Sequence, residues 1–212
     1  MTFVGQLELA QLDPEVWPGP REGLLSFFCW ISPEYLGVDG SGLARVLHLP
    51  PGEPLVARPL PDELDPDLRP GAVPVEPRPE LMLPAIAVDV DAALEPLGFG
   101  WGGERDDDAY LELRQAIAAE QGHPAKQPNG AWAVKHRLLG WAEQVQGDVM
   151  LDIEAIHGPD DDIADWRLLL QVEADRRMIG SFGDGGALYF AIPAADLEAG
   201  RFDRVEAVTQ AG

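Results

Sequence analysis

Two glutamines are the residues of this chain whose type and placement most clearly suggest binding chemistry. Gln6 lies within Val4-Gly5-Gln6-Leu7-Glu8, and Gln171 lies within the similar Leu169-Leu170-Gln171-Val172-Glu173. A glutamine amide offers two N–H donors and a carbonyl acceptor, so a pair facing one cleft could hold a polar ligand or each other. The alternative, which we favour, is structural: each amide satisfies backbone groups where a pair of strands opens.

His136 is the only histidine within a motif, His136-Arg137-Leu138-Leu139-Gly140-Trp141. Imidazole titrates near neutral pH, so His136 could carry a proton. No nucleophile or acid is obvious beside it, and Gln146 and Asp148 are its sequence-near polar partners. We therefore expect His136 to pin a helix to the turn at residues 146–148, with proton transfer as the alternative. His136 and Gln146 join the two glutamines as candidate ligand-binding residues.

Three other patterns are weaker as sites. Gly183-Asp184-Gly185-Gly186 resembles a phosphate loop, but a strand is expected to follow it, so a hairpin turn is the better interpretation. Residues 160–162 and Asp165 lack the alternating ligands of a calcium loop and are read as a solvated acidic loop. One cysteine and scattered histidines do not provide zinc-ligand spacing. We expect no metal, no cofactor and no catalytic set, which favours a protein that is not an enzyme.

The charge balance limits the partners of the chain. Among 212 residues, 37 are acidic and 15 are basic, a net charge of -22. Such a surface repels phosphate backbones, so nucleic-acid binding is not expected. A basic partner protein, attracted by charge, is one interpretation, and solubility alone is the simpler one.

The expected location is the cytoplasm, without membrane association. The chain shows no basic start followed by an apolar leader, and no apolar run approaches the roughly 20 residues that span a bilayer. Cys29 stands alone in the apolar run 27–31, where a buried and inert thiol is expected.

The surroundings of the two glutamines indicate an internal repeat. A Gly-containing turn and an apolar strand follow each glutamine, with Gln-to-Gly spacings of 17 and 15 residues, and an Arg-Val pair comes next. We expect strands at residues 2–9, 24–31 and 43–49 in one half-repeat (1–49). The other half-repeat (166–212) is expected to hold strands at 166–173, 187–192 and 202–208, with a helical turn at 193–197.

The middle of the chain differs in composition. Residues 50–84 contain 11 of the 20 prolines and are predicted to form an extended strap with apolar anchors, followed by an edge strand at 84–90. Helices are expected at 107–121, 134–141 and 149–156, within a helical middle spanning 104–157. Strands at both ends with helices between them predict a single α+β domain over 1–212.

Several motifs resemble those of the YwqG-like bacterial proteins, a domain family of unknown function. The matching segments are His136-Arg137-Leu138-Leu139-Gly140-Trp141 with Gln146, Trp166–Gln171, Gly183–Phe190, and the tail from Asp196 to Gln210, together with the first strand around Gln6. The resemblance implies a pseudo-symmetric α+β fold in a bacterial cytoplasm, and some members have been suggested to act as immunity proteins beside toxins. Family members usually carry a Gly-, Pro- and Trp-containing segment before the first strand. This chain begins almost on that strand: either the segment has been lost or the start is truncated, and no site is assigned to it.

Two functions follow as hypotheses. The leading one is an acidic protein-binding module, which could be of the immunity type. The alternative is a small-molecule binder or enzyme that uses a cleft between the repeats.

Overall fold

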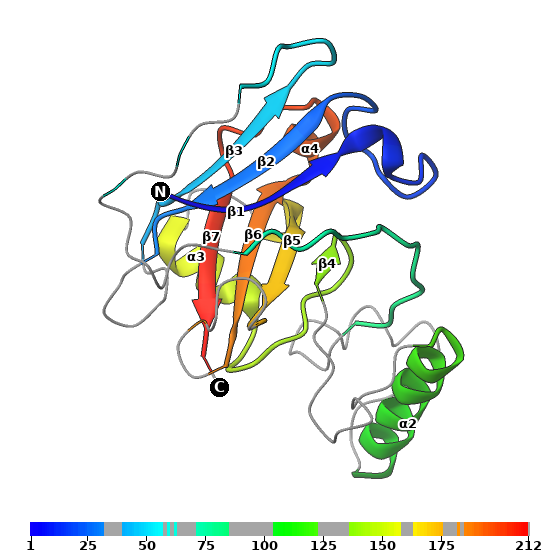
Figure 1. Cartoon of the computed structure of the whole chain (residues 1–212). Helices are drawn as coiled ribbons and strands as arrows, with labels where there is room; N and C mark the ends of the chain where they lie inside the picture. The colour runs from blue at the N-terminus through cyan, green and yellow to red at the C-terminus, as the bar shows by residue number, and fades with distance from the viewer. Residues whose placement is uncertain are drawn as a thin grey trace.

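The chain folds into two open antiparallel sheets with few helices, which confirms the α+β class (Figure 1). The computed structural model describes residues 1–31, 40–56, 59, 62, 71–84, 104–122, 136–157, 163–175, 182 and 185–211. None of the described helices is long and apolar enough to cross a membrane.

The first sheet contains β1 (Thr2–Glu8), β2 (Leu24–Cys29) and β3 (Ala44–Leu49), in that order. A short 3-10 helix, η1 (Leu9–Gln11), follows β1. These three strands lie where the sequence predicted them, although β2 ends at Cys29 rather than at Ile31. Their inward side chains include Val4, Leu25, Phe27 and Val46, all of which are buried.

The second sheet has the order β4 (Arg137–Leu138), β5 (Trp166–Glu173), β6 (Ala187–Pro193) and β7 (Glu206–Gln210). Every residue of β6 is buried, as expected for a central strand covered on both faces. The last strand begins at Glu206 rather than at Phe202, because Asp196 binds Arg201 and Arg204 and holds the preceding residues in a turn.

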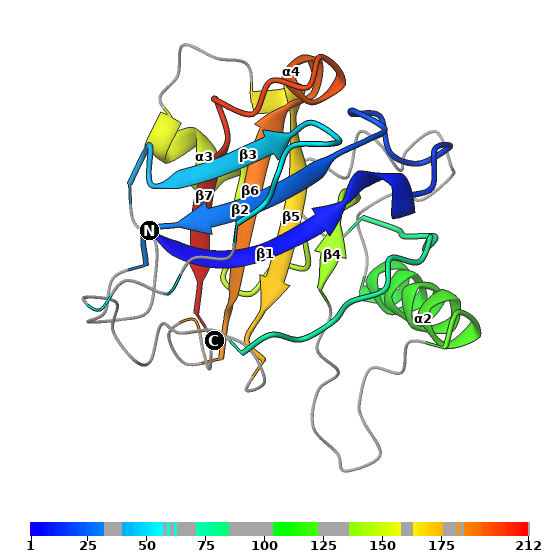
Figure 2. The ribbon, with the colours of Figure 1, turned by 45° about the horizontal axis from the view of Figure 1, so that its top comes forward.

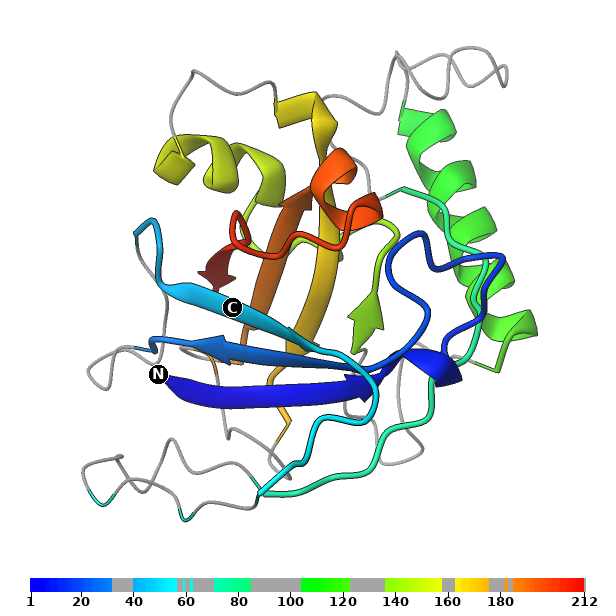
Figure 3. The same ribbon diagram turned by 90° about the horizontal axis from the view of Figure 1, so that it is seen from above.

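The two sheets and one helix form three layers. The strands of the first sheet run across those of the second (Figure 2), and a core that includes Phe27, Leu169 and Phe190 fills the space between them. Helix α3 (Val149–His157) covers the opposite face of the second sheet (Figure 3). There Ile153 packs in a smaller core with Tyr189 and the surrounding apolar side chains.

The remaining helices lie at the periphery. Helix α2 (Glu104–Glu120) stands beside the sheets, and the short α4 (Ala194–Glu198) follows β6 (Figure 1). A 3-10 turn, η4 (Ile163–Asp165), precedes β5. The helices predicted at 107–121 and 149–156 are therefore confirmed, whereas most of the edge strand predicted at 84–90 lies outside the described residues.

The helix predicted at 134–141 is wrong for the residues that the structure describes there. Arg137 and Leu138 instead pair with β5 as the strand β4. Leu139 and Gly140 then adopt φ values of 60° and 74°, and two successive left-handed residues cannot continue a right-handed helix. A short apolar run is ambiguous between strand and helix, and the open edge of β5 decided the outcome.

The two sheets share one pairing pattern around the two glutamines. Gln6 pairs with Ser26 on β2, and Gln171 pairs with Tyr189 on β6. Each strand also has a bulge just before its glutamine, between Phe3 and Gly5 in β1 and between Leu168 and Leu170 in β5.

The same equivalence holds for one glycine in each sheet. A Cβ atom on Gly23 would collide with the carbonyl oxygen of Leu49, at the end of β3. A Cβ atom on Gly186 would collide with the carbonyl oxygen of Gln210, at the end of β7. Each glycine therefore permits a close approach of two chain segments at matching places in the two sheets.

Candidate functional site

A cavity of about 1380 Å³ lies beside β1. Its walls come from β1, from the described proline-rich residues 71–80 with Met82, and from β4 with the turn that follows it. Apolar side chains on these walls include Phe3, Leu7, Trp17, Val73, Leu138 and Trp141. The cavity thus brings together the two halves of the chain and the proline-rich region between them.

The outer edge of β1 opens toward this cavity. In the described part of the chain, β1 has a neighbouring strand on one side only, which is β2. Gly5 lines the cavity from this strand, and a Cβ atom built there would meet nothing within 4 Å. Backbone groups of an edge strand are available for pairing, and the missing side chain of Gly5 leaves space beside them.

Helix α2 holds the proline-rich wall in place. Gln121, just after the helix, accepts a hydrogen bond of 2.6 Å from the N–H of Leu81 and donates one of 2.9 Å to its carbonyl oxygen. The buried hydroxyl of Tyr110 donates to the carbonyl oxygen of Pro84 at 2.7 Å. Proline lacks an N–H donor, so this segment runs past β1 as an extended chain and does not join the sheet (Figure 2).

Of the predicted site residues, Gln6 and His136 line the cavity. Gln6 is exposed on β1. His136 directly precedes β4, and its Nε2 lies 3.5 Å from Oδ2 of the buried Asp175. Asp175 lies outside the turn at 146–148 that the sequence suggested as the partner of His136.

Gln171 lies behind the cavity, on the face of the second sheet that α3 covers. Its side chain is fully buried. Oε1 accepts a hydrogen bond of 2.9 Å from the N–H of Glu143, and Nε2 donates one of 3.1 Å to Glu173. This is the structural role that the sequence favoured for the glutamines. The structure therefore does not place Gln6 and Gln171 in one cleft.

Gln146 is not among the residues that line the cavity, and its side chain is exposed. Its backbone N–H donates to Oε1 of Gln210 at 3.1 Å, as the N–H of Val145 does at 2.8 Å. Nε2 of Gln210 donates to the carbonyl oxygen of Gly147 and to Asp152. Sequence reasoning missed Gln210 as an anchor, although it belongs to the tail motif.

Arg137 is a second residue that sequence reasoning missed. Its side chain is 6% exposed, and its Nη1 lies 3.6 Å from Oε1 of Glu143. Within the described residues, Nε and Nη1 of Arg137 have no hydrogen-bond partner, and the residue is among those that line the cavity. A buried guanidinium whose donors make no hydrogen bond can bind an anionic group.

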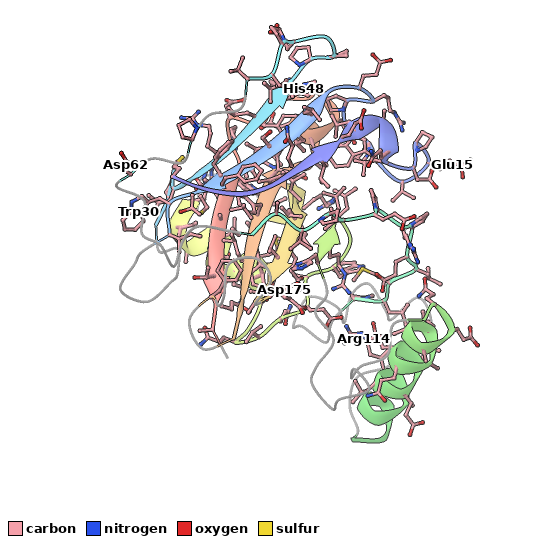
Figure 4. All side chains as sticks on the ribbon, in the orientation of Figure 1. Glu15, Trp30, His48, Asp62, Arg114 and Asp175 are labelled. Atoms are coloured by element: carbon pink, nitrogen blue, oxygen red, sulfur yellow. The ribbon has the colours of Figure 1, made fainter. Side chains whose placement is uncertain are left out.

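Glu143 connects Arg137 to helix α2. Arg114 projects from α2 toward the sheets (Figure 4), and its Nη2 donates to both carboxylate oxygens of Glu143, at 3.1 and 3.2 Å. The hydroxyl of Tyr189 donates to the carbonyl oxygen of Glu143 at 2.6 Å, and burial raises the pKa of this tyrosine. The hydroxyl therefore stays protonated and serves as a fixed donor.

A family described as a domain of unknown function, DUF1963, matches residues 1–210. The chain belongs to the DUF1963 family. No curated protein matches its sequence. The cavity beside β1, the hydrogen bonds of Gln171 and Gln210 and the contacts of α2 are thus features of this DUF1963 chain.

The structure describes only part of the other patterns noted in the sequence of this DUF1963 chain. Among the described residues, no group of three or more His, Cys, Asp and Glu side chains is placed to hold a metal ion. Residues 160–162, 183 and 184, which carry the acidic-loop and glycine-loop patterns, lie outside the described residues. Cys29 is buried, and burial raises its pKa to about 12, as expected for an inert thiol.

Proposed function

We propose that this DUF1963 chain is a binding module that takes an extended segment of a basic partner protein into the cavity beside β1. The observation that carries this proposal is the size of the cavity, about 1380 Å³. Sites for small molecules have volumes of roughly 300–1,000 Å³, so the space suits a peptide segment better. The net charge of -22 would attract a basic partner from a distance.

The proposal extends to the origin of the fold. We take residues 1–49 and 166–212 to be an internal duplication, supported by the equivalent bulges before Gln6 and Gln171 and by the equivalent contacts of Gly23 and Gly186. We take the proline-rich residues 50–84 to be an ordered strap, supported by the hydrogen bonds that Gln121 makes to Leu81.

The finer family placement is also a proposal. The motifs around His136 and Gln171 support a YwqG-like member of the family that works in the cytoplasm. A basic toxin neutralised by an immunity-type interaction is one partner that fits the charge of the chain.

Selection of displayed random peptides on the wild-type protein tests the function. Gly5→Trp would place a large side chain in the open space beside β1, whereas Gly5→Ala adds one methyl group and serves as the matched control. We expect selected peptides to carry Lys or Arg and to bind Gly5→Ala normally. Their binding to Gly5→Trp should be weaker by at least roughly tenfold, because the cavity is filled. Peptides that bind both variants equally would overturn the proposal.

A small anionic ligand is the second candidate, carried by the buried donors of Arg137. Under this alternative, a benzoate or a short fatty acid should bind in calorimetry and lose affinity in Arg137→Gln. Peptide selection should then yield nothing that depends on Gly5. The two candidates are separated by which substitution weakens binding: Gly5→Trp for a peptide segment, or Arg137→Gln for a small anion.

A further inference from the structure

The outer edge of β5 shows how this fold holds an extended segment. Arg137 pairs with Gln171 and Leu138 pairs with Leu170. The N–H of Leu139 then donates to the carbonyl oxygen of Leu169 at 3.2 Å. After the turn at Leu139 and Gly140, the chain returns and the N–H of Glu143 donates to Oε1 of Gln171. The strand edge and the glutamine amide therefore both bind main-chain groups.

The outer edge of β1 occupies the equivalent position in the first sheet. Its bulge and its glutamine match those of β5 in register, and Glu8 corresponds to Glu173 in the same way. The described part of the chain places no strand on this edge, and Gln6 is exposed there beside the cavity. In the second sheet, the strand edge and the glutamine amide thus bind another segment of the chain. In the first sheet, the equivalent groups are accessible.

We propose that β1 binds the extended segment of the partner by strand addition, with Gln6 binding its main chain as Gln171 binds Glu143. This inference rests on the proposed function and specifies its mode of recognition. Strand addition is a general way for an edge strand to bind a peptide, with affinity from main-chain hydrogen bonds.

The equivalence also specifies the side chains of the ligand. The ligand residue opposite Gln6 corresponds to Arg137, and Glu8 would lie beside it as Glu173 lies beside Gln171. A basic residue is therefore favoured there, in agreement with the net charge of -22. The ligand residue opposite Gly5 corresponds to Leu138, whose side chain packs toward the core between the sheets. An aliphatic residue at this place would fill the open space beside Gly5.

A synthetic peptide with the sequence of residues 135–144 is the probe, because it contains the basic and aliphatic pair in this order and the residue whose N–H binds the glutamine amide, Glu143. Its binding is followed by NMR, through the amide shifts of the full-length protein. We expect saturable shifts at residues 4–7. A peptide with a methylated backbone nitrogen at the residue corresponding to Leu139 should not cause these shifts, because it lacks a main-chain donor.

The variant Gln6→Ala should weaken this binding by roughly tenfold, since one hydrogen bond to the ligand is lost. Gln115→Ala is the matched control, because Gln115 is an exposed glutamine on α2 that is not among the residues lining the cavity. It should leave the affinity unchanged.

Three results would overturn strand addition: no binding of the probe, shifts away from β1, or equal affinity for Gln6→Ala and the wild type. The proposed function fails separately. If selected peptides need the space beside Gly5 but ignore Gln6 and N-methylation, the cavity binds a partner segment in another way. If no selected peptide needs that space, the proposed function itself is wrong.

Discussion

The N–H of Glu143 donates a hydrogen bond of 2.9 Å to Oε1 of Gln171, whose side chain is fully buried. This bond ties the segment after β4 to the middle of β5. Gln6 has the same register position in the first sheet, yet it is exposed and lines the cavity. One residue type at one position therefore stabilises the fold in the second half and is accessible in the first.

The two glutamines should differ in their contribution to stability. Gln171→Ala is expected to lower the free energy of unfolding by about 1–3 kcal/mol, because the N–H of Glu143 loses its acceptor. Gln6→Ala should change it by less than about 0.5 kcal/mol, because the side chain is exposed. Urea denaturation of both variants measures the difference, and equal losses would contradict the assignment.

Three glycines should respond differently to the same added methyl group. Gly186→Ala and Gly23→Ala are expected to cost about 3 kcal/mol each, because the new Cβ atom meets a backbone carbonyl oxygen. Gly23 also has a φ of 95°, which an alanine rarely adopts. Gly5→Ala should be neutral or stabilise by about 0.5–1 kcal/mol, since its Cβ position is open and alanine loses less backbone entropy on folding. Thermal unfolding of the three variants checks this order.

The thiol of Cys29 should be unreactive in the folded protein. Burial raises its pKa from 9.0 to about 12, so the thiolate is scarce at moderate pH. The folded state keeps this proton to higher pH than the unfolded state does. Its contribution to stability is therefore present below pH 9.0 and declines as the pH rises toward about 12. Mass spectrometry after iodoacetamide treatment should show labelling only in denaturant. Rapid labelling of the native protein would disprove the burial.

Removing the hydroxyl of Tyr110 should loosen the proline-rich wall. Tyr110→Phe loses the hydrogen bond of 2.7 Å to the carbonyl oxygen of Pro84. We expect a loss of about 1 kcal/mol in the free energy of unfolding and faster limited proteolysis within residues 71–84. Leu111→Ala, at a position 43% exposed on the same helix, is the control and should cleave at the wild-type rate. Unchanged cleavage of Tyr110→Phe would show that this contact does not hold the segment.

Much of the secondary structure could be predicted from local pattern. The strands around Gln6 and Gln171 and the helix from Val149 follow from the spacing of apolar residues. The segment around Arg137 could not, because a short apolar run fits a helix or a strand. This segment forms a strand because it pairs with the open edge of β5, which is distant in sequence.

The candidate site was predictable only in part. Gln6 and His136 were named from sequence and both line the cavity. Gln171 and Gln146 were named for the same reason, but one is buried behind the cavity and the other lies elsewhere. Arg137 and Gln210 lie within the quoted motifs but were not singled out there, since the polar contacts of a side chain depend on which segments meet it after folding.

The sequence by itself determined the α+β class, the net charge of -22 and the similarity between the segments around Gln6 and Gln171, because these are properties of composition and local periodicity. Only the tertiary structure decided the different environments of the two glutamines. The segment after β4 folds onto β5 and covers Gln171, whereas the described chain leaves the edge of β1 open beside the cavity. The physical reason is that burial and hydrogen bonding are set by contacts between residues distant in sequence, which local patterns do not encode.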